Sequence, residues 1–379
     1  MPEFFATTSK GLGVALEQEL TELGLAKVRR LANAVYFEGN WESCYRTNLH
    51  SRIASRVLKP VFDFTAYNLD ELFGQVLKHD FTKHIDMPFS LKVEASVEES
   101  KIHDQRMLAL KVKDAICDQF REAGGARPDV DKLQPDLRVY IRGQKNQFSI
   151  AIDTTGESLY RRGYREDAGV APLRENLAAG ILRLMQWKPG TQLLDPMCGS
   201  GTFLIEAAQI QFRIAPGSYR RRFGFQRLKN YQKEIWARLV EEALAQEIPP
   251  EPGLFWGFDA DPRIIKLARA NADRAGVGPA ISFQKALIAT LQKPPGFGTG
   301  VLVSNPPYGL RLGDVHELHD VYKDLGYTLK KEFAGSEAWI LAGEKDLTPD
   351  LRLKSDRRFS VHNGSVDCRL LHYPLKAFG

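Results

Sequence analysis

The chain has 379 residues, more than a single domain usually holds, so we expect two or three domains, each large enough for its own core. Hydrophobic residues make up 43% and charged residues 26%, which is ordinary for a soluble globular protein and argues against a disordered chain. Lys and Arg total 52 against 47 acidic residues, and the net charge of +5 permits nucleic-acid binding without requiring it.

The sequence predicts neither a membrane segment nor a metal site. The chain starts without a basic leader, and no apolar run approaches the length that spans a bilayer, so a cytoplasmic protein is expected. Two histidines form an H-x-x-H pair without further ligands, and four cysteines are scattered without a C-x-x-C pair, which argues against zinc and against a disulfide framework. These residues are His316, His319, Cys44, Cys117, Cys198 and Cys368.

Residues 1–64 are predicted to form a small α+β sandwich, because short strands alternate with helices. The first helix places Leu12, Leu16, Leu20 and Leu23 on one face. The expected strands cover residues 4–7, 28–31, 34–38 and 56–64, and a second helix covers residues 41–49.

Residues 65–160 continue with helices and a hairpin. Helices are expected over residues 72–76 and 107–120, the second with an aligned apolar face. Apolar and polar residues alternate over residues 137–141 and 148–152, and Gly143–Asn146 supplies a turn between them, so this pair is predicted to be a β-hairpin.

The segment Tyr160–Arg165 interleaves three arginines with two tyrosines. This composition suits phosphate contact and base stacking, so Arg161, Arg162 and Arg165 are predicted to bind RNA. The alternative is a linker that packs its tyrosines on the following domain, and the sequence leaves both interpretations open. A helix is expected next, over residues 172–184.

An apolar strand ending in Asp195 leads into a glycine-rich turn and then a helix. Glycines let the backbone approach a ligand closely, and a helix start offers N–H groups. The spacing of Gly199 and Gly201 does not fit the dinucleotide pattern G-x-G-x-x-G, and no Lys follows for a P-loop. A turn without phosphate chemistry but with an acidic strand end favours S-adenosylmethionine, whose amino group is cationic. The predicted donor-binding residues are Asp195, Pro196, Met197, Gly199, Ser200, Gly201 and Thr202.

The segment between this turn and the next strand, which we call the excursion, is longer than a strand-helix-strand unit needs. Long excursions inside a compact domain are usually functional, and this one mixes basic and aromatic residues, as single-stranded nucleic-acid sites do. We therefore expect it to contact RNA near the active site through Arg220, Arg221 and Arg222. Its other basic and aromatic residues are Phe212, Arg213, Tyr219, Phe223, Phe225, Arg227, Lys229 and Tyr231.

A second acidic strand end follows, where the strand Leu254–Phe258 is followed by Asp259. A carboxylate at this place can accept both ribose hydroxyls of the donor. The alternative role for Asp259 is a helix N-cap, but Asp261, directly before Pro262, is better placed for that role.

The tetrapeptide Asn305-Pro306-Pro307-Tyr308 follows the apolar run Val301–Val303 and is predicted to hold an exocyclic base amine. The Asn side-chain oxygen and the next carbonyl can each accept one amine hydrogen, which directs the nitrogen lone pair at an electrophile. The two prolines fix these acceptors, and the aromatic ring can stack on an extruded base. A bare tetrapeptide of this kind is often only a turn, but its position after a buried strand, where ligands bind in doubly wound sheets, favours a site.

The last expected strands cover residues 338–341, 358–362 and 366–373. Asn363-Gly364 favours a type I′ turn, so the last two of these strands are predicted to form an antiparallel hairpin.

These motifs resemble those of the class I, Rossmann-like methyltransferases that act on exocyclic amines, and more narrowly the THUMP-domain RNA guanine-N2 methyltransferases. Within that family the chain is most similar to the N-terminal half of the bifunctional bacterial 23S rRNA guanine-N2 methyltransferases, and the resemblance covers nearly its whole length. The motifs that carry it are Gly11-Leu12, Ser51–Arg56, Met107–Ala115, Arg162–Arg165, Leu193–Ala208, Gly257–Asn271, Ser304–Gly309, Asn363-Gly364 and Asp367-Cys368.

The resemblance implies an α/β fold with a Rossmann-like methyltransferase domain over residues 161–379. It also implies an N-terminal ferredoxin-like α+β subdomain over residues 1–64 and a THUMP RNA-binding domain over residues 65–160. The implied reaction is transfer of a methyl group from S-adenosylmethionine to guanine N2 in RNA, most closely 23S rRNA.

One departure from the family pattern concerns the third strand of the catalytic domain. The family has an acidic residue after this strand that holds the adenine amino group, whereas the stretch Ile281–Leu287 carries none. We expect backbone groups near Leu287 to replace it, with weaker donor binding as the consequence.

Three alternatives stay open. A tRNA guanine-N2 methyltransferase of the same family has the same motifs. A DNA adenine or cytosine methyltransferase can use the same tetrapeptide, although the N-terminal half favours RNA. A catalytically silent RNA-binding or ribosome-assembly factor is favoured only by the missing acidic residue.

Overall fold

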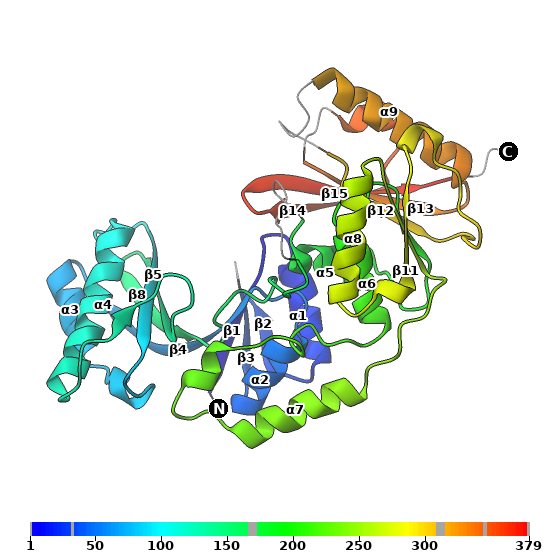
Figure 1. Ribbon diagram of the computed structural model, residues 1–379. Coiled ribbons are helices and arrows are strands. Elements are labelled where there is room, and N and C mark those ends of the chain that lie inside the picture. Colours follow the sequence, from blue (N-terminus) through cyan, green and yellow to red (C-terminus); the bar gives the residue numbers. More distant parts are fainter. Residues whose placement is uncertain (1, 32–33, 166–172, 308–314, 344–346, 377–379) are drawn as a thin grey trace. The chain divides into compact units, whose positions relative to one another are not determined.

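The computed structural model describes residues 2–31, 34–165, 173–307, 315–343 and 347–376, and Figure 1 labels most of its helices and strands. By its internal contacts the chain divides into two compact units. The first contains residues 1–7, 20–159 and 220–241, and the second contains residues 8–19, 160–219 and 242–379.

The described part of the first unit is built on an eight-stranded sheet with the order β2-β3-β1-β4-β8-β7-β5-β6. Its neighbouring strands are antiparallel, except that β5 runs parallel to both β6 and β7. The strands are β1 (Glu3–Thr7), β2 (Ala26–Arg30), β3 (Ala34–Glu38), β4 (Arg56–Thr65), β5 (Ser90–Glu98), β6 (Asp129–Val130), β7 (Leu137–Gln144) and β8 (Gln147–Asp153).

Helices α2 (Trp41–His50), α3 (Leu69–Leu77) and α4 (Gln105–Glu122) belong to the same unit. Each begins at a side chain that accepts backbone N–H groups of the first turn, which are otherwise unpaired at a helix start. These N-caps are Asn40, Asn68 and Asp104. Helices α3 and α4 lie side by side, and α4 packs on β5 (Figure 1).

The elements predicted for residues 1–160 are all present. The β7–β8 hairpin closes through Lys145 and Asn146, which both have positive φ, as a type I′ turn requires. Strand β5 was not predicted, although Leu91, Val93 and Val97 alternate with polar residues along it.

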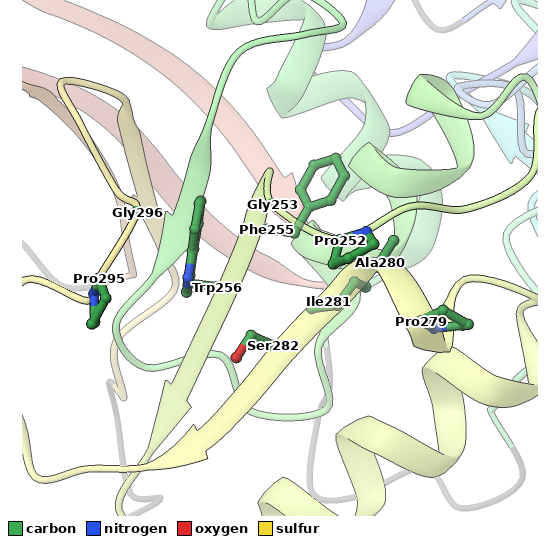
Figure 2. Close-up of a pocket in the computed structure, with 10 residues that line it drawn as sticks. All are labelled: Pro252, Gly253, Phe255, Trp256, Pro279, Ala280, Ile281, Ser282, Pro295 and Gly296. Carbon is green, nitrogen blue, oxygen red and sulfur yellow. The ribbon is translucent and has the colours of Figure 1, made fainter.

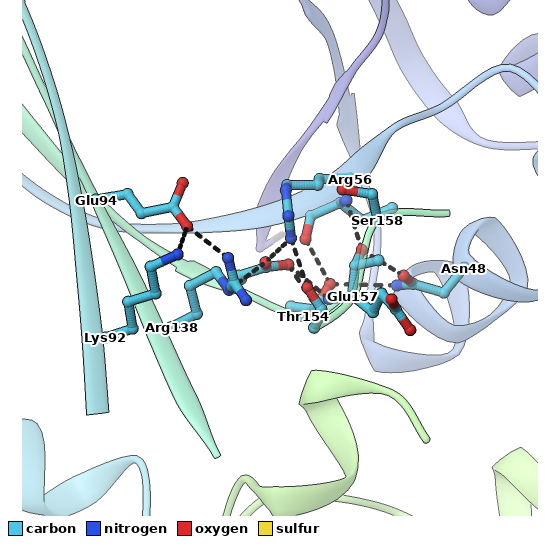
Figure 3. A network of polar contacts seen from close by, with 12 residues as sticks. Asn48, Arg56, Lys92, Glu94, Arg138, Thr154, Glu157 and Ser158 are labelled. Carbon is cyan, nitrogen blue, oxygen red and sulfur yellow. Dashed lines mark hydrogen bonds and ion pairs between the residues drawn. The ribbon is translucent and has the colours of Figure 1, made fainter. Parts of the chain in front are cut away.

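A buried network of charges ties β4, β5, β7 and β8 together (Figure 3). Arg56 and Arg138 both face the carboxylate of Asp153, and Arg138 also pairs with Glu94. Burial raises the pKa of Asp153, while the two guanidinium groups oppose that rise. Removal of either arginine would leave a buried charge with less compensation, which is costly in a protein interior.

The described part of the second unit is built on a seven-stranded sheet with the order β11-β10-β9-β12-β13-β15-β14. The first five strands in this order are parallel, and β15 is antiparallel to both of its neighbours. The strands are β9 (Leu193–Asp195), β10 (Phe255–Asp259), β11 (Ile281–Lys285), β12 (Val301–Ser304), β13 (Glu337–Ala342), β14 (Arg357–Asn363) and β15 (Val366–Pro374).

Central strands β9 and β12 are buried along their whole length, as their continuous apolar runs predict for parallel strands covered on both faces. The remaining helices are α1 (Gly13–Glu22), α5 (Glu175–Leu184), α6 (Thr202–Gln211), α7 (Lys233–Ala245), α8 (Pro262–Arg274) and α9 (Val315–Glu332). Helix α7 lies inside the predicted excursion and was not expected from the sequence.

The predicted fold class is confirmed: the second unit has a Rossmann-like sheet that ends in the expected antiparallel hairpin. Its turn is formed by Gly364 and Ser365, and only Gly364 has positive φ (+67°), so the type I′ turn predicted from Asn363-Gly364 is wrong. Within the described ranges, no helix is both long and apolar enough to cross a bilayer. The division into domains at residues 64 and 160 stays a prediction, and the contacts add that residues 220–241 pack with the first unit.

Candidate active site

Three neighbouring strands bring the residues predicted to bind the methyl donor and the target amine to one edge of the second sheet. β9 is hydrogen-bonded to β10 on one side and to β12 on the other, and all three strands are parallel. Asp195 ends β9 opposite Gly257, and Asp259 ends β10 two residues later. Asn305 directly follows β12. Because parallel strands have their carboxyl ends at the same edge, these three polar side chains lie where Rossmann-like folds bind ligands.

Asp195 is 2% exposed, and its Oδ1 accepts the Met197 N–H at 3.1 Å. Burial raises the pKa of Asp195 to about 8, and the Met197 hydrogen bond opposes this rise only in part. Since a buried carboxyl group is ionised readily only beside a positive charge, Asp195 is suited to a cationic ligand group.

The turn that starts at Asp195, residues 195–202, is called the donor turn below. Backbone hydrogen bonds and two glycines maintain its shape. The Cys198 N–H donates to the Phe258 carbonyl at 2.7 Å, and the Gly201 N–H donates to the Cys198 carbonyl at 2.9 Å. Gly199 and Gly201 have φ of +52° and +83°, values that L-residues rarely adopt. A Cβ on Gly201 would lie 2.9 Å from the Phe283 ring, whereas a Cβ on Gly199 would meet nothing within 4 Å. The turn therefore packs tightly below Gly201 and is open at Gly199.

Asp259 links the ends of β9 and β10. Its carboxylate accepts the Gly199 N–H at 3.1 Å and the Asp261 N–H at 3.0 Å, and burial raises its pKa. Asp261 is the N-cap of α8 and accepts the Arg263 N–H at 2.8 Å. The predicted cap is therefore confirmed, which leaves Asp259 outside that role and able to face a ligand.

Asn305 carries the acceptor predicted from the tetrapeptide. Its Oδ1 is buried and has no hydrogen-bond partner among the described residues. Pro306 is buried as well, whereas Pro307 is partly exposed and Tyr308 lies outside the described residues. A buried, unpaired oxygen costs free energy, so an oxygen of this kind at a strand end is suited to accept a hydrogen bond from a ligand.

Leu287 follows the strand that lacks the expected acidic residue. The Ala286 N–H donates to the Asp259 carbonyl at 3.0 Å, and the Leu287 carbonyl accepts the Thr290 N–H at 3.1 Å. The Leu287 side chain is 56% exposed. Leu287 therefore presents an apolar side chain at the edge of the sheet where Asp195 and Asp259 lie, which we call the donor edge.

Arg162 and Arg165 make internal contacts beneath the donor turn. Arg162 pairs with Glu206 in α6 at 3.3 Å, and the two side chains are 3% and 0% exposed. Tyr164 is buried too and donates to Glu206 at 3.3 Å. Arg165 donates to the Thr202 hydroxyl at 2.6 Å. These contacts favour the linker alternative over RNA contact for Arg162 and Arg165, while Arg161 is exposed.

A second support reaches the turn from α8. Asn271 donates to the Ser200 carbonyl at 3.0 Å, and Arg274 donates to Asn271 Oδ1 at 2.7 Å. Sequence reasoning did not single out Glu206, Asn271 or Arg274. The available signal was weak: Glu206 is a charged residue within the apolar helix of residues 202–211.

Three phenylalanines of the excursion are buried, and two of them share one aromatic cluster. The centre of the Phe225 ring lies 4.4 Å from that of Tyr45. The ring centres of Phe223 and Trp236 lie 5.2 Å and 5.0 Å from that of Phe225. Phe212, Phe223 and Phe225 are at most 4% exposed. The faces of these three rings are therefore covered by protein and are not available for base stacking.

The arginines of the excursion differ in their surroundings. Arg220 donates to the carbonyl groups of Glu157 and Ser158. Arg222 and Arg227 both pair with Asp136. Arg221 is exposed. RNA binding by Arg220, Arg221 and Arg222 stays a prediction. A phosphate at Arg220 or Arg222 would share the guanidinium group with protein oxygens.

A search for metal ligands among the described residues finds no group of three or more His, Cys, Asp or Glu side chains. His319 pairs with Asp350, and the four cysteines are buried thiols. The His316 side chain lies outside the described residues.

An apolar cavity of about 370 Å³ lies at the amino ends of β10 and β11 (Figure 2). Phe255 and Ile281, which begin these strands, line it together with Trp256 and Pro295. Asp259 ends β10 at the opposite end, so this cavity is separate from the donor edge.

The sheet order and the three strand ends define a Rossmann-like methyltransferase domain. Residues 162–372 match the family described as "RMKL-like, methyltransferase domain". Residues 3–58 match "RlmL ferredoxin-like domain", and residues 66–153 match "THUMP domain". The chain belongs to the family of the RMKL-like methyltransferase domain, and the resemblance predicted from its motifs is confirmed.

Two relatives are both named "Ribosomal RNA large subunit methyltransferase K/L". The protein of Photobacterium profundum is 39% identical over 380 residues, which cover 100% of this chain and 53% of the relative. The protein of Vibrio campbellii is 38% identical over 378 residues, which cover 99% of this chain and 54% of the relative. The chain thus spans about half the length of the curated relatives it matches.

Two solved structures are similar along the whole chain. SMU.472, described as a putative methyltransferase complexed with SAH, is 31% identical with a TM-score of 0.88, covering 100% of this chain and 99% of the other. A protein of Listeria monocytogenes, described as a predicted N6-adenine-specific DNA methylase, is 30% identical with a TM-score of 0.87, covering 98% of this chain and 96% of the other.

Proposed function

We propose that the chain transfers a methyl group from S-adenosylmethionine to the exocyclic N2 amine of a guanine in 23S rRNA. The observation that carries this proposal is the buried, unpaired Oδ1 of Asn305, at the strand edge shared with Asp195 and Asp259. The names of the relatives support ribosomal RNA as the substrate, and the THUMP match supports RNA binding. A protein that modifies rRNA works where ribosomes are made, so we expect it in the cytoplasm.

Asn305 Oδ1 and the Pro306 carbonyl accept the two hydrogens of the target amine. This arrangement draws the nitrogen lone pair out of the aromatic ring and directs it at the methyl carbon. Pro306 and Pro307 hold both acceptors rigidly, because their φ angles are fixed. Tyr308, by its place in the sequence, stacks on the base.

The donor side uses the turn and the two strand-end acids. Asp195 pairs with the donor's ammonium group, the residues from Pro196 to Thr202 surround its methionine part, and Asp259 accepts its ribose hydroxyls. Leu287 offers apolar contact to the adenine. When bound, the donor supplies a sulfonium methyl group, so that the N2–CH3 bond forms as the S–CH3 bond breaks. The chain holds the two reactants in line, and the amine proton passes to water.

Exposed arginines of both units contact the RNA. Arg161 and Arg221 are exposed, and we propose that they contact phosphates. Arg162 and Arg165 hold the donor turn from below, and Arg220 and Arg222 add charge to a surface that they also brace.

The test is methyl transfer from tritiated S-adenosylmethionine to an unmodified 23S rRNA transcript, with the product identified by nucleoside mass spectrometry. Asn305→Ala should lower kcat by roughly 10²- to 10³-fold, the usual effect of removing one electrostatic contact to the reacting group. Asn305→Asp keeps an acceptor oxygen at the same place and should retain more activity than the Ala variant. Asn230→Ala removes an exposed Asn elsewhere and serves as the matched control.

Calorimetric titration with S-adenosylmethionine accompanies the assay, and both Asn305 variants should bind it as the wild type does. If the wild type methylates tRNA or an adenine N6 instead, the proposed substrate is wrong while the chemistry stands. If the wild type methylates no RNA and no DNA, the chain is a silent binding protein.

A further inference from the structure

A second cavity, of about 440 Å³, lies on one face of the strands β13, β15 and β14. The short helical turn of residues 348–351 and the segment that follows it form its other wall. We refer to this cavity as the hairpin groove. It is lined by Ala342, Gly343, Thr348, Pro349, Leu353, Ser355, Arg358, Ser360, Asp367, Cys368, Arg369, Leu371 and Tyr373.

The hairpin groove combines positive charge with an apolar floor. Arg358 and Arg369 are exposed at its sides, and within the described residues neither guanidinium group has a carboxylate partner. The one acidic residue of the lining, Asp367, already pairs with His362. Leu371 and Tyr373 are buried and supply the apolar surface of the groove floor.

Three aliphatic hydroxyl groups add to the polar lining. They belong to Thr348, Ser355 and Ser360. Hydroxyl and guanidinium groups beside an apolar surface suit a phosphate joined to a flat base, since the phosphate accepts hydrogen bonds and the base needs contact with its face.

The hairpin groove begins one strand away from the amine acceptor. β13 is parallel to β12, with Ile340 opposite Ser304. Ala342 ends β13 and lines the groove, while Asn305 follows Ser304. Adjacent strands are about 4.8 Å apart, so a base held at Asn305 leaves the next nucleotide within reach of the groove. Asp195 and Asp259 lie on the other side of β12, which separates the groove from the donor.

We propose that the hairpin groove binds the nucleotide adjacent to the target guanine in the same RNA strand, with its phosphate on Arg358 and Arg369. This inference rests on the proposed function. It assigns the antiparallel hairpin of the catalytic sheet a part in substrate recognition, because β14 and β15 carry both arginines.

The experiment measures binding of the full chain to a radiolabelled, unmodified 23S rRNA transcript on filters over a series of KCl concentrations. The variant Arg358→Ala with Arg369→Ala should lower the slope of log affinity against log salt by about two, one for each lost phosphate contact. Arg358→Lys with Arg369→Lys keeps the charges and should keep the slope. The control Lys188→Ala with Lys331→Ala removes two exposed charges elsewhere in the second unit and should leave the slope unchanged.

Donor titration and thermal melting of each variant show whether the fold and the donor site are intact. A slope for the double Ala variant that equals the wild-type slope would overturn the proposal, and it would leave the groove to an acidic peptide instead. Methyl transfer by the wild type is measured in the same samples. If it is absent, the proposed function fails, while the slopes still decide whether the groove contacts RNA.

Discussion

The donor turn, residues 195–202, and the excursion between this turn and β10, whose basic and aromatic residues lie at positions 212–231, are specified in different ways. In the donor turn, the backbone conformation depends mainly on residues of the turn itself. Gly199 and Gly201 provide the positive φ angles, and Asp195 ends a buried strand. In the excursion, Phe225 packs on Tyr45, which lies 180 positions earlier (225 − 45), and Arg222 pairs with Asp136.

The difference shows what composition can and cannot predict. A glycine at a strand end limits the backbone wherever it occurs, so a motif of this kind carries its geometry with it. A run of arginines and aromatic rings is compatible with RNA contact and equally with a protein interior. Only the fold decides between these two outcomes, because it determines whether apolar partners cover the rings.

The largest effect is expected in the excursion. Phe225→Ala should destabilise the first unit by about 3–5 kcal/mol, as large-to-small changes of buried Phe do, because its ring is 0% exposed. Urea unfolding followed by tryptophan fluorescence measures this, since Trp236 lies 5.0 Å from the Phe225 ring.

Tyr219→Ala, in the same excursion but 66% exposed, is the matched control and should change stability by less than about 0.5 kcal/mol. Equal stability of the two variants would show that the excursion does not serve as a core, and the contrast with the donor turn would then disappear.

A slightly smaller effect is expected below the donor turn. Glu206→Gln keeps the side chain's size but removes the carboxylate that pairs with the buried Arg162, which should cost about 3 kcal/mol. Arg162→Met combined with Glu206→Leu removes both charges and should recover part of this loss. The measurement is chemical denaturation of both variants; if the double variant is the less stable one, the pair contributes more than charge compensation.

The donor turn itself should show a pH dependence. Burial raises the pKa of Asp195 from 3.8 to about 8, so between these values the folded chain binds a proton that the unfolded chain has lost, and stability from this group falls as pH rises. A cationic donor prefers the ionised form. Donor affinity should therefore fall by about tenfold per pH unit below pH 8.

Titration calorimetry of S-adenosylmethionine binding between pH 6 and pH 9, in buffers of different ionisation enthalpy, tests this and should show release of about one proton at pH 7. Asp195→Asn should bind weakly with little dependence on pH. A wild-type affinity that does not change across this range would remove Asp195 from the ammonium contact.

Much of the fold follows from local sequence patterns. The apolar runs around Leu193 and Leu302, and the turn at Asn363-Gly364, predict the catalytic sheet and its final hairpin, since each needs only neighbouring residues. Strand β5 and helix α7 escaped prediction. The polar side of the alternation in β5 is mostly charged, and the composition of the excursion around α7 favoured RNA contact.

The candidate site was predictable at its strand ends but not beneath them. Asp195, Asp259 and Asn305 each end or follow a strand, a position that the sequence marks. Asn271 supports Ser200 from 71 positions away, and nothing near either residue indicates the pairing. Support of this kind depends on how α8 packs on α6, which becomes visible only in the folded chain.

The smallest effect separates two neighbouring arginines of the excursion. Arg221 is exposed, whereas Arg222 pairs with Asp136, so a phosphate near Arg222 would meet a charge that is already compensated. Arg221→Ala should therefore lower the salt slope of RNA binding by about one, and Arg222→Ala should leave it nearly unchanged. Reversal of Arg220, Arg221 and Arg222 together to Glu should weaken binding further. Filter binding at several salt concentrations separates the variants. Each lost phosphate contact reduces the number of counterions released on binding. Identical slopes for all variants would therefore place the RNA away from the excursion.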